Sequence, residues 1–307
     1  MSGRSSYFVA GVFIALAGSV CFSTKAIFVK LAYRDTTVDA ISLLALRMIF
    51  SLPFFVASAW VSSSKSDNVK FTGTQWIQIA IVGAMGYYVS SLLDFLGLRY
   101  ISAGLERLIL FVYPTIVVLI SAYYYKQEIK GHQWGALALT YLGLFIAFAG
   151  EVNLLPANDS GFYLGSIFVF ACAITFAIYI VGSGRIIPVV GAAKFNSYAM
   201  SFAAVGVLSH YVISNGPSLL HLDWLVYAYA FSMAILATVI PSYLISEGIK
   251  RIGSDNAAIV ASIGPVSTLA QAYFFLGEPI LTLQIVGTVL ILTGVVLVGW
   301  KPKRNLA

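Results

Sequence analysis

Charge is the scarcest property of this chain. Only 10% of its 307 residues are charged, against about 25% in an average soluble domain, and 60% are apolar. Its 18 basic and 12 acidic residues are too few to cover the surface of a soluble protein of this length. The composition also excludes a disordered chain, a coiled coil and a secreted disulfide scaffold. The remaining class is a protein that crosses the bilayer many times.

Cysteine and histidine are also rare. Cys21 and Cys172 each lie inside an apolar run, and the histidines, His132, His210 and His221, have no acidic partner at ligand spacing. Neither a metal site nor a nucleophile with its base is indicated. We therefore expect no cofactor, no metal and no enzymatic activity.

Long runs with little or no charge dominate the sequence. Each has at least 18 residues, long enough for a spanning helix, because lipid cannot satisfy an open backbone. The ten runs are Ser5–Thr24, Ala40–Ser64 (interrupted by Arg47), Phe71–Leu93, Leu108–Tyr125, Gln133–Gly150, Ser160–Gly184, Phe195–Leu222, Trp224–Ser246, Asn256–Gly277 and Pro279–Trp300.

The positive charges predict the orientation in the membrane. With ten spans and a cytoplasmic N-terminus, 12 basic residues lie inside and only Lys30, Arg34 and Arg99 lie outside. This split predicts that both termini are cytoplasmic. It also explains the net charge of +6 by the lipid bilayer rather than by nucleic acid, which we do not expect as a partner.

The second half of the chain resembles the first at an offset of 151 residues. Pro114 corresponds to Pro265, and the other pairs are Cys21 and Cys172, Gly97 and Gly248, Gln133 and Gln284, and Gly143 and Gly294. Five spans per unit is an odd number, so the second unit enters the membrane from the opposite side. The predicted fold is an all-α membrane protein of ten transmembrane helices, arranged as two inverted-topology five-helix repeats, 1–152 and 153–307.

Several motifs are familiar. The segment Tyr100–Pro114, the segment Gly253–Pro265 and the sequence Phe275-Leu-Gly-Glu-Pro279 resemble the EamA repeats of the drug/metabolite transporter superfamily. Arg47 and Lys30 match basic residues of that family. One departure is Phe22-Ser23, where the family usually has Trp-Gly, and it weakens any transfer of substrate identity.

The resemblance implies a multi-pass carrier of the cell inner membrane. Such carriers often export amino acids or other small metabolites, so we expect a small organic substrate, moved outward by alternating access at a site between the repeats. An importer of a charged nutrient on the same fold is the main alternative, and a channel is a weaker one. A monomer and a homodimer both remain open.

Five charged residues are expected in the outer half of the membrane, all in the first repeat: Lys25, Arg47, Asp94, Glu106 and Arg107. Charge inside a span is costly and often functional. Lys25 and Arg47 are candidates to attract an anionic group of the substrate. Asp94, Glu106 and Arg107 are candidates for a gate or for proton coupling, because a carboxyl group removed from water can bind a proton near neutral pH. Ion pairs that only join helices, or snorkelling at the interface, are the alternatives.

Polar and aromatic residues near mid-span complete the predicted site. The further candidates for substrate binding are Ser23, Tyr87, Tyr88, Tyr113, Tyr179, Tyr198, Tyr243 and Gln271. Pro114 and Pro265 each remove a backbone hydrogen bond, so we interpret them as a candidate pair of hinges.

Overall fold

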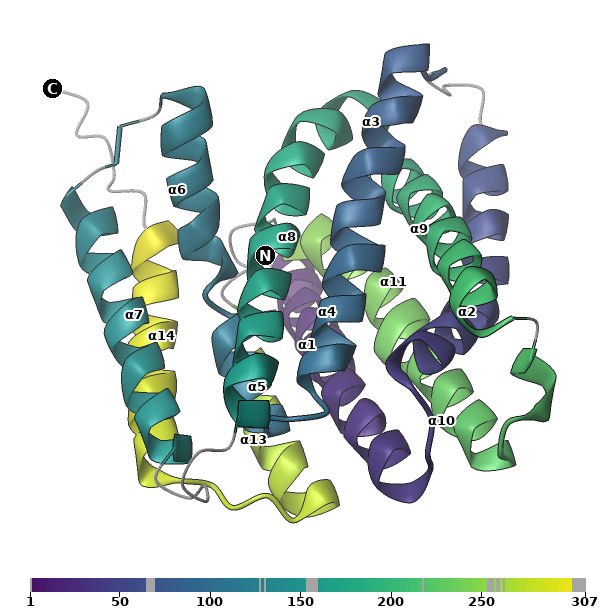
Figure 1. Ribbon diagram of the computed structural model, residues 1–307. Helices are drawn as coiled ribbons and strands as arrows, with labels where there is room; N and C mark the ends of the chain where they lie inside the picture. The colour runs from purple at the N-terminus through teal and green to yellow at the C-terminus, as the bar shows by residue number, and fades with distance from the viewer. Residues whose placement is uncertain are drawn as a thin grey trace, which may run out of the picture.

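The computed structural model describes residues 2–64, 70–126, 128–129, 131–152, 160–216, 218–252, 257, 260–261 and 263–299. All of the regular secondary structure in these ranges is helical (Figure 1). The helices, in chain order, are α1 (Ser2–Asp35), α2 (Ala40–Ser63), α3 (Gly73–Gly83), η1 (Ala84–Val89), α4 (Ser90–Gly97), α5 (Ala103–Leu110), α6 (Tyr113–Tyr125), α7 (Gly131–Val152), α8 (Ser160–Val190), α9 (Ala192–Asn215), η2 (Ser218–His221), α10 (Trp224–Ala234), η3 (Ile235–Val239), α11 (Ile240–Ile252), α13 (Gly264–Gln271), η4 (Ala272–Leu276) and α14 (Thr282–Gly299).

Eight helical stretches of the described chain are long and apolar enough to cross a membrane. They coincide with the first eight of the ten expected runs. In the last two, the described helices are shorter: Gly264–Leu276 from α13 and η4, and an apolar stretch at Thr282–Leu297 within α14. The structure thus confirms an all-helical protein of many spans, and it describes fewer full-length spans than the sequence predicts.

Charged side chains lie inside two of the helices, as the sequence indicates. Lys25 lies within α1, which continues beyond Lys30 to Asp35. Glu106 and Arg107 lie near the start of α5, which begins at Ala103. The charge-free runs that end at Thr24 and begin at Leu108 are therefore shorter than the helical segments that contain them.

Polar residues at the helix starts account for several boundaries. Asp39 accepts hydrogen bonds from the second and third amides of α2, and Ser102 accepts one from Leu105 at the start of α5. Thr72 and Gln75 form a reciprocal capping box before α3. Each cap satisfies amides that have no partner inside the helix.

The packing of the helices is reciprocal between the two halves of the chain. α1 packs along α11, while α8 packs along the continuous segment of α3, η1 and α4. α2 packs against α9, α5 against α13, and α7 against α14. Each of these pairs joins a helix of the first half to one of the second, so the interface between the halves runs through the whole molecule.

Glycines at equivalent positions permit two of these close approaches. A Cβ atom on Gly97 would overlap Val169 of α8, and a Cβ atom on Gly248 would overlap Ala15 of α1. Gly97 and Gly248 are separated by the same 151 residues as the sequence repeat. Small residues therefore sit where the backbones of two helices meet.

Backbone irregularities fall in register as well. The π-helical segments η1 and η3 begin at Ala84 and Ile235, which are 151 residues apart. Lys126 after α6 and Gly277 after η4 have the same offset, and both are left-handed, with φ of 52° and 70°. π-helical segments are rare, so their recurrence at this offset is a specific structural similarity between the halves.

The two ends of the helix bundle are used as reference points below. The Asp35 end is the end at which α1 and α7 stop and α5 begins, and it lies at the bottom of Figure 1. The opposite end, where α2 stops, is called the Ser63 end.

Candidate functional site

A buried ion pair links α1 to α4. The Lys25 ammonium lies 2.6 Å from Oδ2 of Asp94, and their side chains are 8% and 0% exposed. Besides this ammonium, neither oxygen of Asp94 receives a hydrogen bond from the described residues. The pair lies well inside the bundle, where bringing two charges out of water costs several kcal/mol per ion.

α5 brings two more charged groups to the same place. Glu106 has no exposed surface, and its carboxyl group interacts electrostatically with Asp94, Lys25 and Arg107. Neither of its oxygens accepts a hydrogen bond within the described part of the chain. Arg107 donates from Nε to Thr268 of α13 at 3.0 Å. Glu106 is therefore a buried acidic group beside the Asp94 carboxyl group, and the two can share a hydrogen bond when one of them carries a proton.

Arg47 is held separately, next to this cluster. Its Nε donates to Oγ1 of Thr238 in η3 at 3.0 Å, and another nitrogen lies 3.5 Å from Oγ of Ser91. The guanidinium carbon is 5.7 Å from the centroid of the Phe95 ring. Like Arg107, this arginine of the first half is bound by a threonine of the second half. The charged cluster below means Lys25, Asp94, Glu106 and Arg107, with Arg47 beside it.

The cluster belongs to one half of the chain only. At the offset of 151, the positions equivalent to Lys25, Arg47, Asp94 and Glu106 are uncharged: Phe176, Tyr198, Ile245 and Ala257. Three cations and two carboxyl groups leave a formal charge of +1 when both acids are ionised. A surplus positive charge in a buried site favours an anionic group in a bound molecule.

Two tyrosines of the predicted site meet next to Arg47. The hydroxyl groups of Tyr87 and Tyr179 are 2.8 Å apart, and both donate to Oδ1 of Asn196, at 3.4 and 3.3 Å. Tyr87 lies in η1, and its hydroxyl group interacts electrostatically with Arg47. Asn196 was not singled out in the sequence, because nothing in the pattern of an apolar helix distinguishes an inward amide.

The other predicted tyrosines are dispersed. Tyr198 bonds to Ser63 at 2.9 Å, near the Ser63 end, and Tyr88 lies 2.9 Å from Nδ1 of His210. Tyr113 packs edge-on against Phe176. Tyr243 is 49% exposed. Tyr113 also interacts electrostatically with Arg107 of the charged cluster, whereas Tyr88 and Tyr198 are bonded elsewhere.

Ser23 and Gln271 connect α1 to the second half. The Ser23 hydroxyl is shared between the carbonyl groups of Ser19 and Gly264, and the Gln271 amide donates to Val20 at 3.3 Å. Both therefore occupy the interface between the halves, as predicted for a site there, but their polar groups are bound by the protein.

The two candidate hinge prolines occupy equivalent places. Pro114 is the second residue of α6, just after the break that separates α5 from α6, and Pro265 is the second residue of α13. Proline is accommodated there because the first amides of a helix have no partner to lose. The pair of hinges stays a prediction.

The Asp35 end is closed by contacts that the sequence did not indicate. The Glu278 carboxylate accepts hydrogen bonds from the amides of Ala103 and Gly104 at the start of α5, at 3.0 to 3.4 Å. Lys30 donates to the carbonyl group of Ile101 at 3.0 Å. A negative group at the start of a helix is favourable for both amides and helix dipole. Glu278 belongs to the quoted Gly-Glu-Pro motif, but a contact with a residue 175 positions away leaves no local signal.

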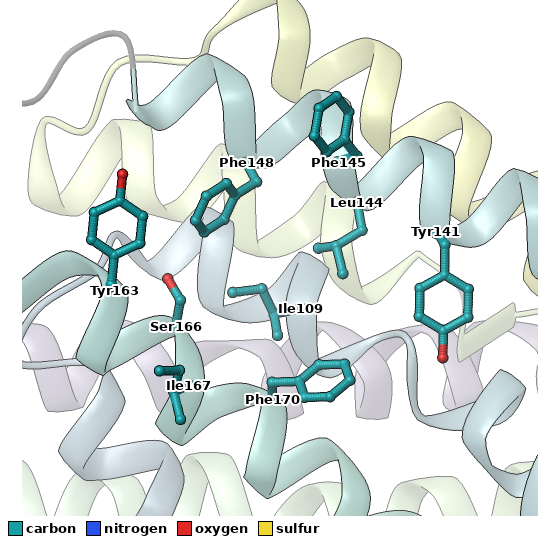
Figure 2. Close-up of a pocket in the computed structure, with 9 residues that line it drawn as sticks. All are labelled: Ile109, Tyr141, Leu144, Phe145, Phe148, Tyr163, Ser166, Ile167 and Phe170. Atoms are coloured by element: carbon teal, nitrogen blue, oxygen red, sulfur yellow. The ribbon is translucent and has the colours of Figure 1, made fainter.

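A hollow of about 410 Å³ lies away from the charged cluster, between α7 and α8. Figure 2 shows its lining, in which aromatic rings from both helices surround Ile109 of α5. Phe145 and Ile167 on its rim are 69% and 64% exposed, so the hollow faces lipid in a membrane. Its apolar walls suit hydrocarbon and offer no partner to a charged solute.

No three histidine, cysteine, aspartate or glutamate residues of the described ranges come together as metal ligands.

The sequence of this chain is similar to those of known transporters. The model of the EamA-like transporter family matches residues 9–149 and again residues 163–300. An uncharacterized transporter of Bacillus subtilis (strain 168), YcbK, is 31% identical over 287 residues, which cover 91% of this chain and 89% of the relative. The uncharacterized inner membrane transporter YicL of Salmonella typhimurium (strain LT2) is 20% identical over 296 residues, 96% of this chain and 97% of the relative.

A solved crystal structure superposes with a TM-score of 0.63 at 17% identity, covering 94% of this chain and 95% of that one. The likeness shows that the fold is shared over nearly the whole length. With two family matches that together span most of its residues, the chain belongs to the EamA-like transporter family of multi-pass membrane proteins.

Proposed function

We propose that this protein is a secondary carrier of the cell inner membrane that exports small anionic or zwitterionic metabolites, such as amino acids. It has ten transmembrane helices in two inverted halves, 1–152 and 153–307, with both termini in the cytoplasm and the Asp35 end outside. It carries out no enzymatic reaction. An importer of a charged nutrient would use the same fold and the same residues.

The recurrence of backbone features at one offset supports the two halves. The π-helical segments η1 and η3, the left-handed helix ends at Lys126 and Gly277, and the prolines of α6 and α13 are in register. The exchange of partners, α1 with α11 and α8 with α3 to α4, is what an inverted pair produces.

The observation that carries the proposal is a buried charged cluster at the interface between these halves. Arg47 and Arg107 hold Thr238 and Thr268 of the second half, so any relative movement of the halves changes the surroundings of the charges. A solute that binds Lys25 or Arg47 therefore biases the arrangement of the halves, which is the requirement for alternating access.

Glu106 is the best candidate for proton coupling in this cluster. Asp94 is engaged by Lys25 at 2.6 Å, whereas the Glu106 carboxyl group has no ion pair within 4.0 Å among the described residues and lies in side-chain contact with Asp94. A proton on Glu106 would supply the hydrogen of that contact and change the charge of the cluster by one unit. Tyr87 and Tyr179 lie nearby and offer hydroxyl groups to an organic solute.

The test begins with a thermal-shift screen of purified protein against amino acids, nucleosides, organic acids and amines. The stabilising compound is then used for counterflow in proteoliposomes. We expect Lys25→Ala to lower counterflow at least about tenfold, since a charge-assisted bond to the solute is lost. Lys250→Ala is the matched control, because that lysine has a 72% exposed side chain at the far end of α11.

Two results would overturn the proposal. If only cationic compounds stabilise the protein, or if Lys25→Ala and Lys250→Ala transport equally well, the charged cluster does not bind the solute. Flux that shows no counterflow would instead support a channel. An imposed pH gradient separates coupled from uncoupled transport, and Glu106→Gln should abolish its effect.

A further inference from the structure

Three basic residues meet around a second hollow, at the Asp35 end of the bundle. It has a volume of about 380 Å³ and lies between the end of α1, the residues after α4 and the end of η4. Its lining consists of Lys30, Tyr33, Arg34, Leu98, Arg99, Leu276 and Glu278. We call it the basic vestibule. This volume is within the range of sites that hold small organic molecules.

The cations of the basic vestibule differ in how they are occupied. Arg34 binds Asp35 at 2.7 Å, and Lys30 donates to the backbone of Ile101. Arg99 is exposed, and its guanidinium carbon lies 5.7 Å from the centroid of the Tyr33 ring. Within the described ranges, neither Lys30 nor Arg99 has a carboxylate within 4.0 Å.

The acidic group in the lining does not neutralise these cations directly. The Glu278 carboxylate is turned to the amides of Ala103 and Gly104, which supply its hydrogen bonds. Three cations and one carboxylate give the lining a formal charge of +2, and two acidic groups beside it, Asp35 next to Arg34 and Glu151, whose charge acts on Lys30, balance that charge. The anion is therefore expected at the exposed guanidinium group of Arg99, whose planar set of donors suits a carboxylate or phosphate group.

The sequence gives these cations added significance. In the orientation proposed above, Lys30, Arg34 and Arg99 are the three basic residues outside the membrane, where lysine and arginine are disfavoured. They come from two separate segments, and the fold brings all three to one place. Basic residues on the outside work against the proposed orientation in the membrane, so the positive-inside rule does not explain why these three converge.

We propose that the basic vestibule is a second anion-binding site, which holds a carboxylate or phosphate group at the Asp35 end. Lys30 lies five residues beyond Lys25 on α1, a rise of about 7.5 Å, so the site is placed one step along the helix from the charged cluster. The placement outside the cell rests on the proposed function, whereas binding of an anion does not.

The anion has two possible sources, a soluble solute and the phosphate headgroup of a lipid. The full-length protein is purified into nanodiscs of neutral phosphatidylcholine and titrated with inorganic phosphate and with citrate, at constant ionic strength and pH. Isothermal titration calorimetry gives the dissociation constant. Addition of phosphatidylglycerol to the nanodiscs should weaken phosphate binding if a headgroup occupies the site, and leave it unchanged if the ligand is soluble.

Arg99 is the residue to change, because it is exposed and outside the buried cluster. We expect Arg99→Gln to raise the dissociation constant about tenfold, and Arg99→Lys to restore most of the affinity, since charge rather than fold is lost. Lys70→Gln is the control; it removes the same charge from an exposed position at the Ser63 end.

Binding that is equal in Arg99→Gln and the wild type, or that falls equally in Lys70→Gln, overturns the inference, as does the absence of any saturable binding. Each of these results can occur while counterflow is intact. Conversely, loss of transport in Lys25→Ala with anion binding retained would separate the two sites. A failure of the vestibule is thus distinguishable from a failure of the proposed transport.

Discussion

Neutralising the two buried carboxyl groups should affect the stability of the protein to very different extents. Asp94→Asn removes the partner of Lys25, from which it is separated by only 2.6 Å. At an effective dielectric constant of about 20, the attraction across this distance is about 6 kcal/mol, and the lost pair leaves a buried ammonium uncompensated. Such a loss lowers the free energy of unfolding by about 3–5 kcal/mol. Glu106→Gln removes a buried acidic group but keeps a hydrogen-bond donor next to Asp94, so we expect a change within about 1 kcal/mol.

The assay is reversible unfolding in mixtures of dodecyl sulfate and a mild detergent, followed by far-ultraviolet circular dichroism. Asp94→Asn should unfold at a clearly lower fraction of dodecyl sulfate, and Glu106→Gln near that of the wild type. Lys25→Met in the Asp94→Asn background should recover stability, because neither charge is then left alone. The reasoning is refuted if Glu106→Gln is as destabilising as Asp94→Asn, or if the double variant is no more stable than Asp94→Asn.

Two further perturbations test the interface between the halves and the closure of the Asp35 end. Gly143→Leu should lower the free energy of unfolding by about 1–3 kcal/mol, because a Cβ atom at this position would lie 2.7 Å from the backbone of α14. Gly135→Leu, on the same helix, has open space around the new side chain and should be near neutral. Equal losses of stability in both variants would contradict the packing of α7 on α14. Glu278→Gln should weaken the contact of residue 278 with the start of α5 by about 1 kcal/mol. In a Cys21→Ser background, Cys172, which is buried near the charged cluster, should then react faster with a water-soluble maleimide. An unchanged rate would show that the Glu278 carboxylate does not keep the Asp35 end closed.

The helical class and the course of the chain were predictable because apolar runs of this length have one solution in lipid. The family followed from the motifs, and the comparisons confirm it. The residues at which the helices begin and end were harder to predict. Lys30 was matched to the lysine that closes the first helix in the family, whereas α1 continues to Asp35.

The members of the candidate site were predictable only as a set. The order of spans indicates that Lys25, Asp94 and Glu106 lie at similar depth. Which of them pair depends on the rotation of each helix about its axis, and hydropathy does not determine that rotation. Glu278 and Asn196 were not predicted as part of the site, because their contacts join segments far apart in the sequence.

The confinement of the charged cluster to one half has a consequence for any cycle of this molecule. If the halves exchange shapes, the exchange cannot be energetically even, since the same electrostatic group is carried by one half while its counterpart is aromatic and aliphatic. The two end states then differ in free energy before any solute binds. The sequence divergence between the two halves would thus make the protein without solute prefer the conformation that is open to one side of the membrane.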